Sequence, residues 1–231
     1  MTFSDVIKRE DYSDSLKGND LMVLDLYGKN AGLYDWLMNR ARYGPTLKAI
    51  ISSLLANVLP NARILDLGCG TGLAMEALVQ RFPRGNITGL DCSREMLNIC
   101  QRKYPGTNLL LGDFNDDRQF CTYNDGNHAG LIDESFDVII SAGAVSEYGS
   151  LERAMPLIYS LMKDDGIFIN LGIRKNLLNR LSGLIWGFKP RSAKEFIAAC
   201  QGSGFQEVEY VRIPWRMFPT NILKYVVKAR K

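Results

Sequence analysis

A glycine-rich turn and the carboxylates near it are the residues of this chain whose types and spacing could do chemistry. The turn lies in ILDLGCGTGL, residues 64–73, where apolar strand-like residues give way to Gly68, Gly70 and Gly72. Because glycine has no Cβ, such a turn lets backbone N–H groups and the start of a following helix approach a ligand closely. Leu73 stands where the dinucleotide fingerprint GxGxxG needs its third glycine, and the turn lacks the Lys-Ser/Thr pair of a P-loop. The pattern therefore disfavours a dinucleotide or a nucleoside triphosphate.

Two further carboxylates indicate the chemistry of the ligand. Asp91 ends the next strand-like run, where an acidic side chain can accept hydrogen bonds from both hydroxyls of a ribose. Asp113 ends the third run, in LLLGDF, where its carboxylate can accept from an exocyclic adenine amine while Phe114 offers an aromatic face. Together with the turn, they predict a ligand that contains a ribose but no pyrophosphate.

The elements that must position these side chains follow an alternating pattern. Short apolar or β-branched runs are separated mostly by stretches of helical periodicity, which predicts parallel pairing through right-handed crossovers and a doubly wound α/β sheet. The runs expected to form strands are residues 62–68, 86–91, 108–113, 136–143, 166–172, 207–213 and 221–230, and a helix is expected at Ser192–Gln201.

Three segments lie outside this alternation. Residues 1–59 are expected to form an N-terminal helical arm or cap, with two helices joined at Gly44-Pro45. Residues 60–231 are expected to form the ligand-binding domain. Inside it, the polar stretch between Phe114 and Ile132 predicts a surface loop or a short helix. A second insertion, about residues 174–190, predicts a helix with its leucines near one face.

Composition restricts the class of protein. The chain has 231 residues, 46% of them hydrophobic, which suits one α/β domain, and its 28 basic and 25 acidic residues give a net charge of only +3. Such a balance gives no support for nucleic-acid binding. Five scattered cysteines and a single histidine argue against a disulfide framework and a zinc site. With no signal-like or membrane-spanning stretch, a cytoplasmic protein is expected.

Four motifs in order carry a resemblance to a known family. They are ILDLGCGTG with Asp66, GLDCSREML with Asp91, LLGDF with Asp113, and ESFDVIISAGAVSEY followed by LMKDDGIFI. Over roughly residues 60 to 172 the chain resembles the class I S-adenosylmethionine-dependent methyltransferases. The resemblance implies a Rossmann-like, mostly parallel seven-stranded sheet with an antiparallel terminal hairpin, and a cofactor lying across the carboxyl ends of the first strands.

The resemblance also assigns expected roles to individual residues. The cofactor would be S-adenosylmethionine, leaving as S-adenosylhomocysteine, with Asp66 and the glycine turn at its aminoacyl end and Asp91 at its ribose. Other members of the set would surround the adenine or line the methyl-transfer site. The expected cofactor-binding residues are Asp66, Gly68, Cys69, Gly70, Gly72, Asp91, Cys92, Met96, Asp113, Phe114, Ser141 and Gly143.

The sequence specifies the residues around the methyl acceptor less closely than those around the cofactor. Methyl transfer from a sulfonium needs little beyond positioning the acceptor and, where required, removing its proton. Glu147 and Tyr148 follow the fourth strand and are the candidate catalytic residues, with capping and packing as the alternative roles. His128, the only histidine, is expected to be solvated, and Cys69 to be a small filler of the turn rather than a nucleophile.

The substrate-binding candidates are Tyr34, Trp186 and Phe188. Tyr34 could fold over the cofactor or simply pack in a helix. The apolar insertion around Trp186 and Phe188 could close a pocket, and its basic flanks would suit an anionic membrane or a lipid-like substrate. A buried helix with a solvated polar edge is the favoured interpretation of that insertion.

The function favoured at this point is methyl transfer to an oxygen, nitrogen or carbon of a small, fairly apolar metabolite. A protein or RNA methyltransferase and a cofactor-binding scaffold without catalysis remain as alternatives. No metal is expected, and the oligomeric state stays open.

Overall fold

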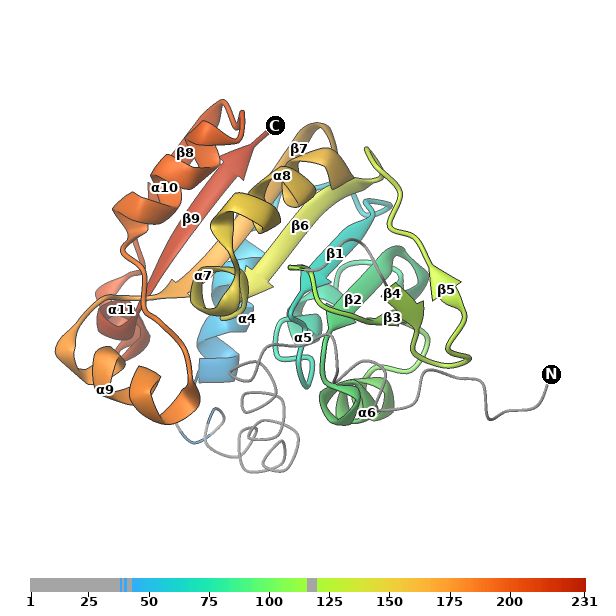
Figure 1. Ribbon diagram of the computed structural model, residues 1–231, viewed down its shortest axis with the longest axis horizontal. Helices are drawn as coiled ribbons and strands as arrows, with labels where there is room; N and C mark the ends of the chain where they lie inside the picture. The colour runs from blue at the N-terminus through green and yellow to red at the C-terminus, as the bar shows by residue number, and fades with distance from the viewer. Residues whose placement is uncertain (1–37, 39, 41–42, 116–119) are drawn as a thin grey trace.

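A mixed β-sheet forms the centre of the protein (Figure 1). The computed structural model describes Met38, Arg40, residues 43–115 and residues 120–231. In this part of the chain the sheet has nine strands in the order β5-β4-β3-β2-β1-β6-β7-β9-β8. Their bounds are β1 Ile64–Leu67, β2 Ile87–Asp91, β3 Asn108–Leu111, β4 Phe120–Thr122, β5 His128–Ala129, β6 Phe136–Ala142, β7 Met162–Ile173, β8 Glu207–Val211 and β9 Lys224–Arg230.

The pairing of the strands confirms the doubly wound sheet with an antiparallel terminal hairpin. β1 pairs in parallel with β2 and β6, β2 with β3, and β6 with β7. β9 lies antiparallel between β7 and β8. All four residues of β1 are buried, as expected for a central parallel strand covered on both faces.

The expected count of seven strands is wrong, because the polar stretch after Phe114 adds two more. β4 pairs antiparallel with β3, and β5 pairs with β4, which extends the sheet beyond β3. The chain was expected to form a loop or short helix here, yet Phe120 is fully buried. Burial of this one ring against the core gives the short hairpin a reason to cover the edge of β3.

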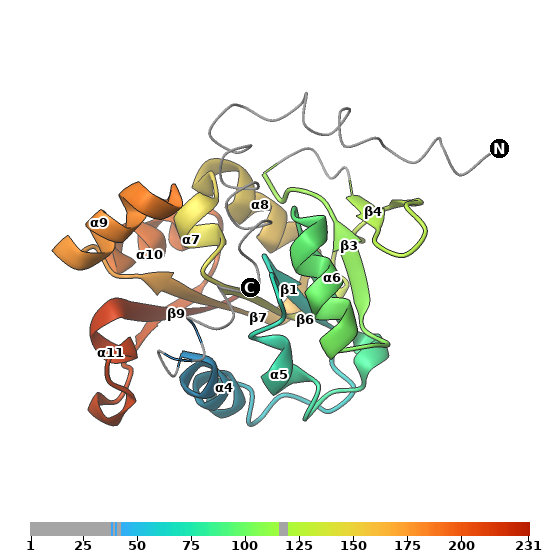
Figure 2. The ribbon, with the colours of Figure 1, turned by 90° about the horizontal axis from the view of Figure 1, so that it is seen from below.

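Helices cover both faces of the sheet (Figure 2). Most buried apolar residues of α4, α5 and α6 belong to the apolar cluster on one face, and those of α7, α8 and α10 belong to the cluster on the other. The helix bounds are α4 Tyr43–Leu54, α5 Met75–Leu78, α6 Arg94–Lys103, α7 Val145–Tyr148, α8 Leu151–Leu161, α9 Leu177–Trp186, α10 Ala193–Gly202 and α11 Thr220–Leu223, with 3₁₀ turns η1 at Arg84–Asn86 and η2 at Trp215–Met217.

The expected break at Gly44-Pro45 falls inside the first turn of α4. Proline is tolerated there because the first N–H groups of a helix have no partner within the helix. Leu47 and Ile51 of α4 then pack in the core. Most of the expected N-terminal arm lies outside the described residues, so its division from residues 60–231 stays a prediction.

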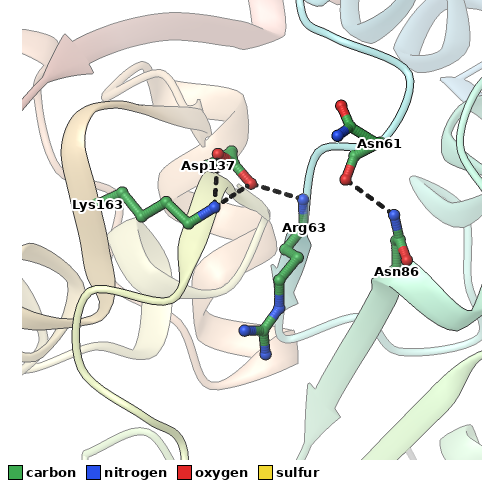
Figure 3. Close-up of polar contacts among 5 residues, drawn as sticks. All are labelled: Asn61, Arg63, Asn86, Asp137 and Lys163. Atoms are coloured by element: carbon green, nitrogen blue, oxygen red, sulfur yellow. Dashed lines mark hydrogen bonds and ion pairs between the residues drawn. The ribbon is translucent and has the colours of Figure 1, made fainter.

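A polar network joins the amino ends of several strands, at the edge opposite the carboxyl ends (Figure 3). Asp137 at the start of β6 accepts a hydrogen bond of 2.8 Å from the backbone N–H of Arg63 and pairs with Lys163 at 2.9 Å. Lys163 belongs to a bulged part of β7. Asn86 donates to the carbonyl of Asn61 at 2.9 Å.

The insertion at 174–190 forms helix α9, as expected, but the interpretation of α9 as a buried helix is wrong. Asn176 caps its start by accepting from the N–H of Asn179, and Gly187 ends it in the left-handed conformation. Four leucines of α9 are 54% to 80% exposed. The reason is placement: α9 lies at one end of the molecule, and none of its described side chains belongs to either apolar core cluster (Figure 1).

Candidate functional site

A cavity opens at the carboxyl ends of β1, β2, β3 and β6, where the turns after these strands meet. The structure brings ten of the twelve expected cofactor-binding residues to its wall, together with Tyr148. Those ten are Asp66, Gly68, Cys69, Gly70, Asp91, Cys92, Met96, Asp113, Phe114 and Gly143. The cavity forms because the carboxyl ends of neighbouring parallel strands share one edge of the sheet.

Glycine is required at the three positions of the turn for different physical reasons. A Cβ at Gly68 would overlap the Cβ of Ala144, and at Gly72 it would lie 2.6 Å from the ring of Tyr104. Both glycines thus allow close packing of protein against protein. A Cβ at Gly70 would meet no protein atom within 4 Å, and Gly70 lines the cavity. Gly70 is therefore the position where the backbone is left open toward a ligand.

Asp66 presents a buried carboxylate to this cavity. Its side chain is 0% exposed, and neither oxygen accepts a hydrogen bond within the described structure. Burial raises the pKa of Asp66 to about 7, and the negative charge of Asp91 contributes in the same direction. A buried carboxylate without a partner is costly in a folded protein. The arrangement suits a ligand that brings a cationic hydrogen-bond donor.

Asp91 at the end of β2 organises the turn. Its Oδ2 accepts from the N–H of Gly70 at 2.8 Å and its Oδ1 from the N–H of Ser93 at 2.9 Å. Ser93 in turn caps α6 by accepting from Met96 N–H. Burial raises the pKa of Asp91 to about 6, although the bonds from these N–H groups oppose the rise. Each oxygen keeps a lone pair with which it can accept from a ligand hydroxyl.

The third carboxylate is oriented by a residue that the sequence did not single out. Oδ1 of Asp113 accepts from the backbone N–H of Asn115 at 2.8 Å and from its side-chain amide at 2.9 Å. Asn115 also accepts from the N–H of Ser150, so it links Asp113 to the start of α8. The only sequence signal for Asn115 is its position two residues after the carboxylate, which is typical of an Asx turn.

Apolar side chains complete this end of the cavity. Met96 and Phe114 are buried and line it, and Cys92 is partly buried beside them. Cys69 lines it too, but a hydrogen bond to Cys100 and burial raise the pKa of the Cys69 thiol well above its usual value. A thiol that stays protonated is a poor nucleophile. This agrees with Cys69 as a filler of the turn.

Two expected site residues point elsewhere. Ser141 is fully buried, and its Oγ accepts from the N–H of Val145, which begins α7. Glu147 is 4% exposed, and its carboxylate accepts from Ser146 Oγ and from the N–H of Ile173, both at 2.6 Å. Neither side chain lines the cavity.

A polar cluster that sequence reasoning missed lies beside Gly143. Lys224 Nζ, from the start of β9, is 3.8 Å from where a Cβ of Gly143 would be, and 4.9 Å from the ring centroid of Tyr43 on α4. The charge of Lys224 acts on Glu147 and on Tyr43, and opposes the rise that burial causes in the pKa of each. The Tyr43 hydroxyl is buried without a hydrogen-bond partner of ordinary geometry. Tyr43 and Lys224 are 181 positions apart in the sequence, so no local pattern could link them.

The remaining expected residues are distributed as follows. Phe188, just after α9, meets the ring of Tyr148 edge-on with a centroid distance of 6.2 Å, which brings it next to the cavity wall. Trp186 ends α9, but its side chain is outside what the structure describes, as is the whole of Tyr34. His128 is exposed on β5, at the far edge of the sheet.

In the described ranges, no group of three or more acidic, cysteine or histidine side chains could hold a metal ion.

The comparison with protein families agrees with this geometry. Residues 65–170 match the family model described as a methyltransferase domain. This range begins in β1 and ends in β7, and it includes every residue that lines the cavity. Lys224, Tyr43 and Phe188, which lie near the cavity, fall outside the range.

Relatives and solved structures extend the match. The chain is 34% identical over 112 residues to a malonyl-[acyl-carrier protein] O-methyltransferase of Magnetococcus marinus, covering 48% of this chain and 38% of that protein. It is 24% identical over 191 residues to a demethylmenaquinone methyltransferase of Thermotoga maritima, covering 82% and 78%. The fold is similar to magnesium protoporphyrin IX methyltransferase from Synechocystis, solved with bound S-adenosylmethionine. There the TM-score is 0.64, the identity 16%, and the coverage 94% of this chain and 99% of that one.

Proposed function

We propose that this chain, whose residues 65–170 match the family model of a methyltransferase domain, is a class I S-adenosylmethionine-dependent methyltransferase that transfers a methyl group to a small and fairly apolar metabolite. The observation that carries the proposal is the buried carboxylate of Asp66, which lines the cavity with no hydrogen-bond partner in the described structure. The aminoacyl end of S-adenosylmethionine has the ammonium group that such a carboxylate needs.

The rest of the cavity fits the same cofactor. Asp91 is oriented to accept from the ribose hydroxyls while it still binds the N–H groups of the turn. Asp113 is positioned for the adenine amine, with Phe114 and Met96 as apolar surfaces for the ring. Gly70 leaves room for the ligand against the backbone. When bound, the cofactor supplies an electrophilic methyl group on its sulfonium, so the protein mainly positions the acceptor.

The acceptor would lie beside Gly143, where the wall changes character. Tyr148 and Phe188 form an apolar side that excludes water from the reacting atoms. Lys224 and Tyr43 form a polar side. An ammonium next to the acceptor favours its deprotonated form, because opposite charge stabilises an anion. Glu147 acts in this proposal as a positioning residue, whose buried charge keeps the Lys224 ammonium at Gly143.

The relatives support a small-molecule acceptor. Two demethylmenaquinone methyltransferases match 82% and 72% of this chain, and other relatives are malonyl-[acyl-carrier protein] O-methyltransferases. Because the match spans only 38% of the Magnetococcus protein, the acceptor of this chain follows from its own cavity rather than from that name. An apolar wall with one ammonium favours an acceptor that combines a hydrophobic body with an acidic hydroxyl.

Calorimetric titration tests the cofactor. S-adenosylmethionine and S-adenosylhomocysteine are expected to bind with micromolar dissociation constants, and nicotinamide dinucleotide is expected not to bind. Asp91→Ala should weaken binding at least tenfold, which corresponds to about 1.4 kcal/mol. Asp164→Ala is the matched control, because this carboxylate is exposed on the bulge of β7 at the opposite end of the sheet. Absence of binding at millimolar cofactor would refute the proposal.

A further inference from the structure

Exposed apolar side chains gather on two segments of the chain. Ten large hydrophobic residues of the described structure are exposed, and seven of them belong to α9, η2, α11 and their junction. We name these seven the α9–α11 face: Leu177, Leu178, Leu181, Leu184, Trp215, Phe218 and Ile222, with exposed fractions from 51% to 85%. Isolated exposed apolar residues are ordinary, whereas a concentration of them marks an interaction site.

The two segments are neighbours in space. Asn179 of α9 donates to the carbonyl of Leu223 at 2.9 Å, and Asn176 donates to the carbonyl of Ile222 at 3.2 Å. The backbone N–H of Arg174 also donates to Leu223, at 2.8 Å. Figures 1 and 2 show α9 and α11 at the same end of the molecule but on opposite sides of the sheet, so the bonds to Ile222 and Leu223 join the two segments around the end of β7 and β9. Leu177, Leu181 and Leu184 share one side of α9, since residues four and three apart align along a helix.

The charge on these segments has one sign. Residues 174–191 and 212–224 contain eight lysines and arginines and no acidic residue, although the whole chain has 28 basic and 25 acidic residues. Five of the eight are exposed: Lys175, Arg180, Lys189, Arg212 and Arg216. Of these, Lys175 pairs with Glu195 of α10 at 3.3 Å. The apolar face is therefore bordered by positive charge, although the rest of the chain has more acidic than basic residues.

We propose that the α9–α11 face docks on the surface of an anionic lipid bilayer. Leucine, tryptophan and phenylalanine side chains lower their free energy by entering the boundary between headgroups and acyl chains, and arginines and lysines around them meet lipid phosphates. With ten residues, α9 is about 15 Å long and cannot cross a hydrocarbon core of about 30 Å. No helix in the described ranges is long and apolar enough to span a membrane. The contact is peripheral.

Charge also distinguishes a bilayer from a second copy of the chain. In a symmetric dimer the same patch would face itself, so the positive borders of both copies would come together. Such like-charge contacts disfavour association, while a surface of anionic headgroups neutralises the positive charges of the border.

The α9–α11 face lies near the cavity wall, because Phe188 follows α9 and contacts Tyr148.

Vesicle flotation with the full chain tests the proposal, and it requires no methyl transfer. Vesicles of phosphatidylcholine alone are compared with vesicles in which a third of the lipid is phosphatidylglycerol. The protein is expected to float with the anionic vesicles only, and to be released by high salt, because the electrostatic part of the attraction is screened. Tryptophan emission should shift to shorter wavelength on binding, and Trp215→Phe should remove most of that shift.

Matched variants identify the surface. Arg180→Glu/Arg216→Glu should weaken binding to anionic vesicles at least tenfold, and Trp215→Ala/Phe218→Ala should abolish flotation. Leu59→Ala and Arg102→Glu are the controls, since both residues are exposed far from α9 in the sequence and in different elements. Thermal melting by circular dichroism verifies that each variant is folded. Equal flotation with neutral vesicles, unchanged binding of the variants, or a dimer that Trp215→Ala dissociates would overturn the proposal.

Discussion

Replacing Asp66 with asparagine should make the free protein more stable relative to the parent as the pH rises, while weakening cofactor binding. Asp66 is fully buried and unpaired, and its pKa rises from 3.8 to about 7 on folding. A folded-state pKa above the unfolded value means that the folded state binds more protons between these pH values. Stability therefore falls as pH increases from about 4 to 7 and is constant above that.

The magnitude follows from the same two values. A rise from 3.8 to about 7 corresponds to about 4 kcal/mol of destabilisation once Asp66 is ionised. Asparagine cannot ionise, so this contribution is absent from the variant. Any pH-independent effect of the new amide on the free energy of unfolding cancels when two pH values are compared. The free energy of unfolding of Asp66→Asn, relative to the parent, should rise by about 3 kcal/mol between pH 5 and pH 8.

Urea denaturation of both proteins at several pH values measures this difference, with Asp164→Asn, at an exposed position on the bulge of β7, as the matched control. Calorimetry at pH 8 should show that Asp66→Asn binds S-adenosylmethionine at least tenfold more weakly, since the neutral amide cannot pair with the ammonium. Below pH 7 the parent should release a proton on binding, visible as a dependence of the heat on the buffer. Unchanged affinity, or a stability difference independent of pH, would refute the role assigned to Asp66.

Three other substitutions test the packing and charge around the site. Gly68→Ala should lower the free energy of unfolding by about 2–4 kcal/mol in urea denaturation, because its Cβ would overlap that of Ala144 at a φ of +71°. Lys224→Met should destabilise the protein by about 2 kcal/mol at pH 8, because the buried Glu147 charge loses its compensation. The loss should shrink as the pH falls, because burial raises the pKa of Glu147 and protonation removes its charge; a loss independent of pH would contradict this pairing. Ser192→Ala removes the capping box of α10 and should lower the free energy of unfolding in urea by about 1 kcal/mol, against little change for the partly buried Ser203→Ala at the other end of that helix.

Local patterns in the sequence predicted the main architecture. The alternation of strand-like and helical runs predicted the parallel strands β1, β2, β3, β6 and β7, because hydrophobic periodicity reflects burial residue by residue. The glycine turn and the acidic residues ending consecutive runs predicted a ligand edge, since parallel strands in a sheet end side by side. That is why Asp66, Asp91 and Asp113 line one cavity although they lie in three separate motifs.

Those local patterns could not predict the direction in which a side chain points. Ser141 lies near the end of β6 and Glu147 in α7, which follows it. The Oγ of Ser141 accepts from the N–H that begins α7, and the carboxylate of Glu147 accepts from the N–H at the end of β7. Gly72 belongs to the predicted turn but packs against Tyr104 rather than toward the ligand. A motif specifies the neighbourhood of such residues, whereas their orientation depends on which elements pack around them.

Only the tertiary structure could decide which distant segments meet. Tyr43 and Lys224 come together beside Gly143 because α4 packs on the sheet face near the start of β9, an arrangement that leaves no local periodicity in the sequence. The burial of Phe120 made an edge hairpin from a polar stretch. The position of α9 at one end of the molecule, outside both apolar core clusters, left its leucines exposed. Local sequence determines the period of burial along an element, but the surface that each element meets is determined by the packing of the whole chain.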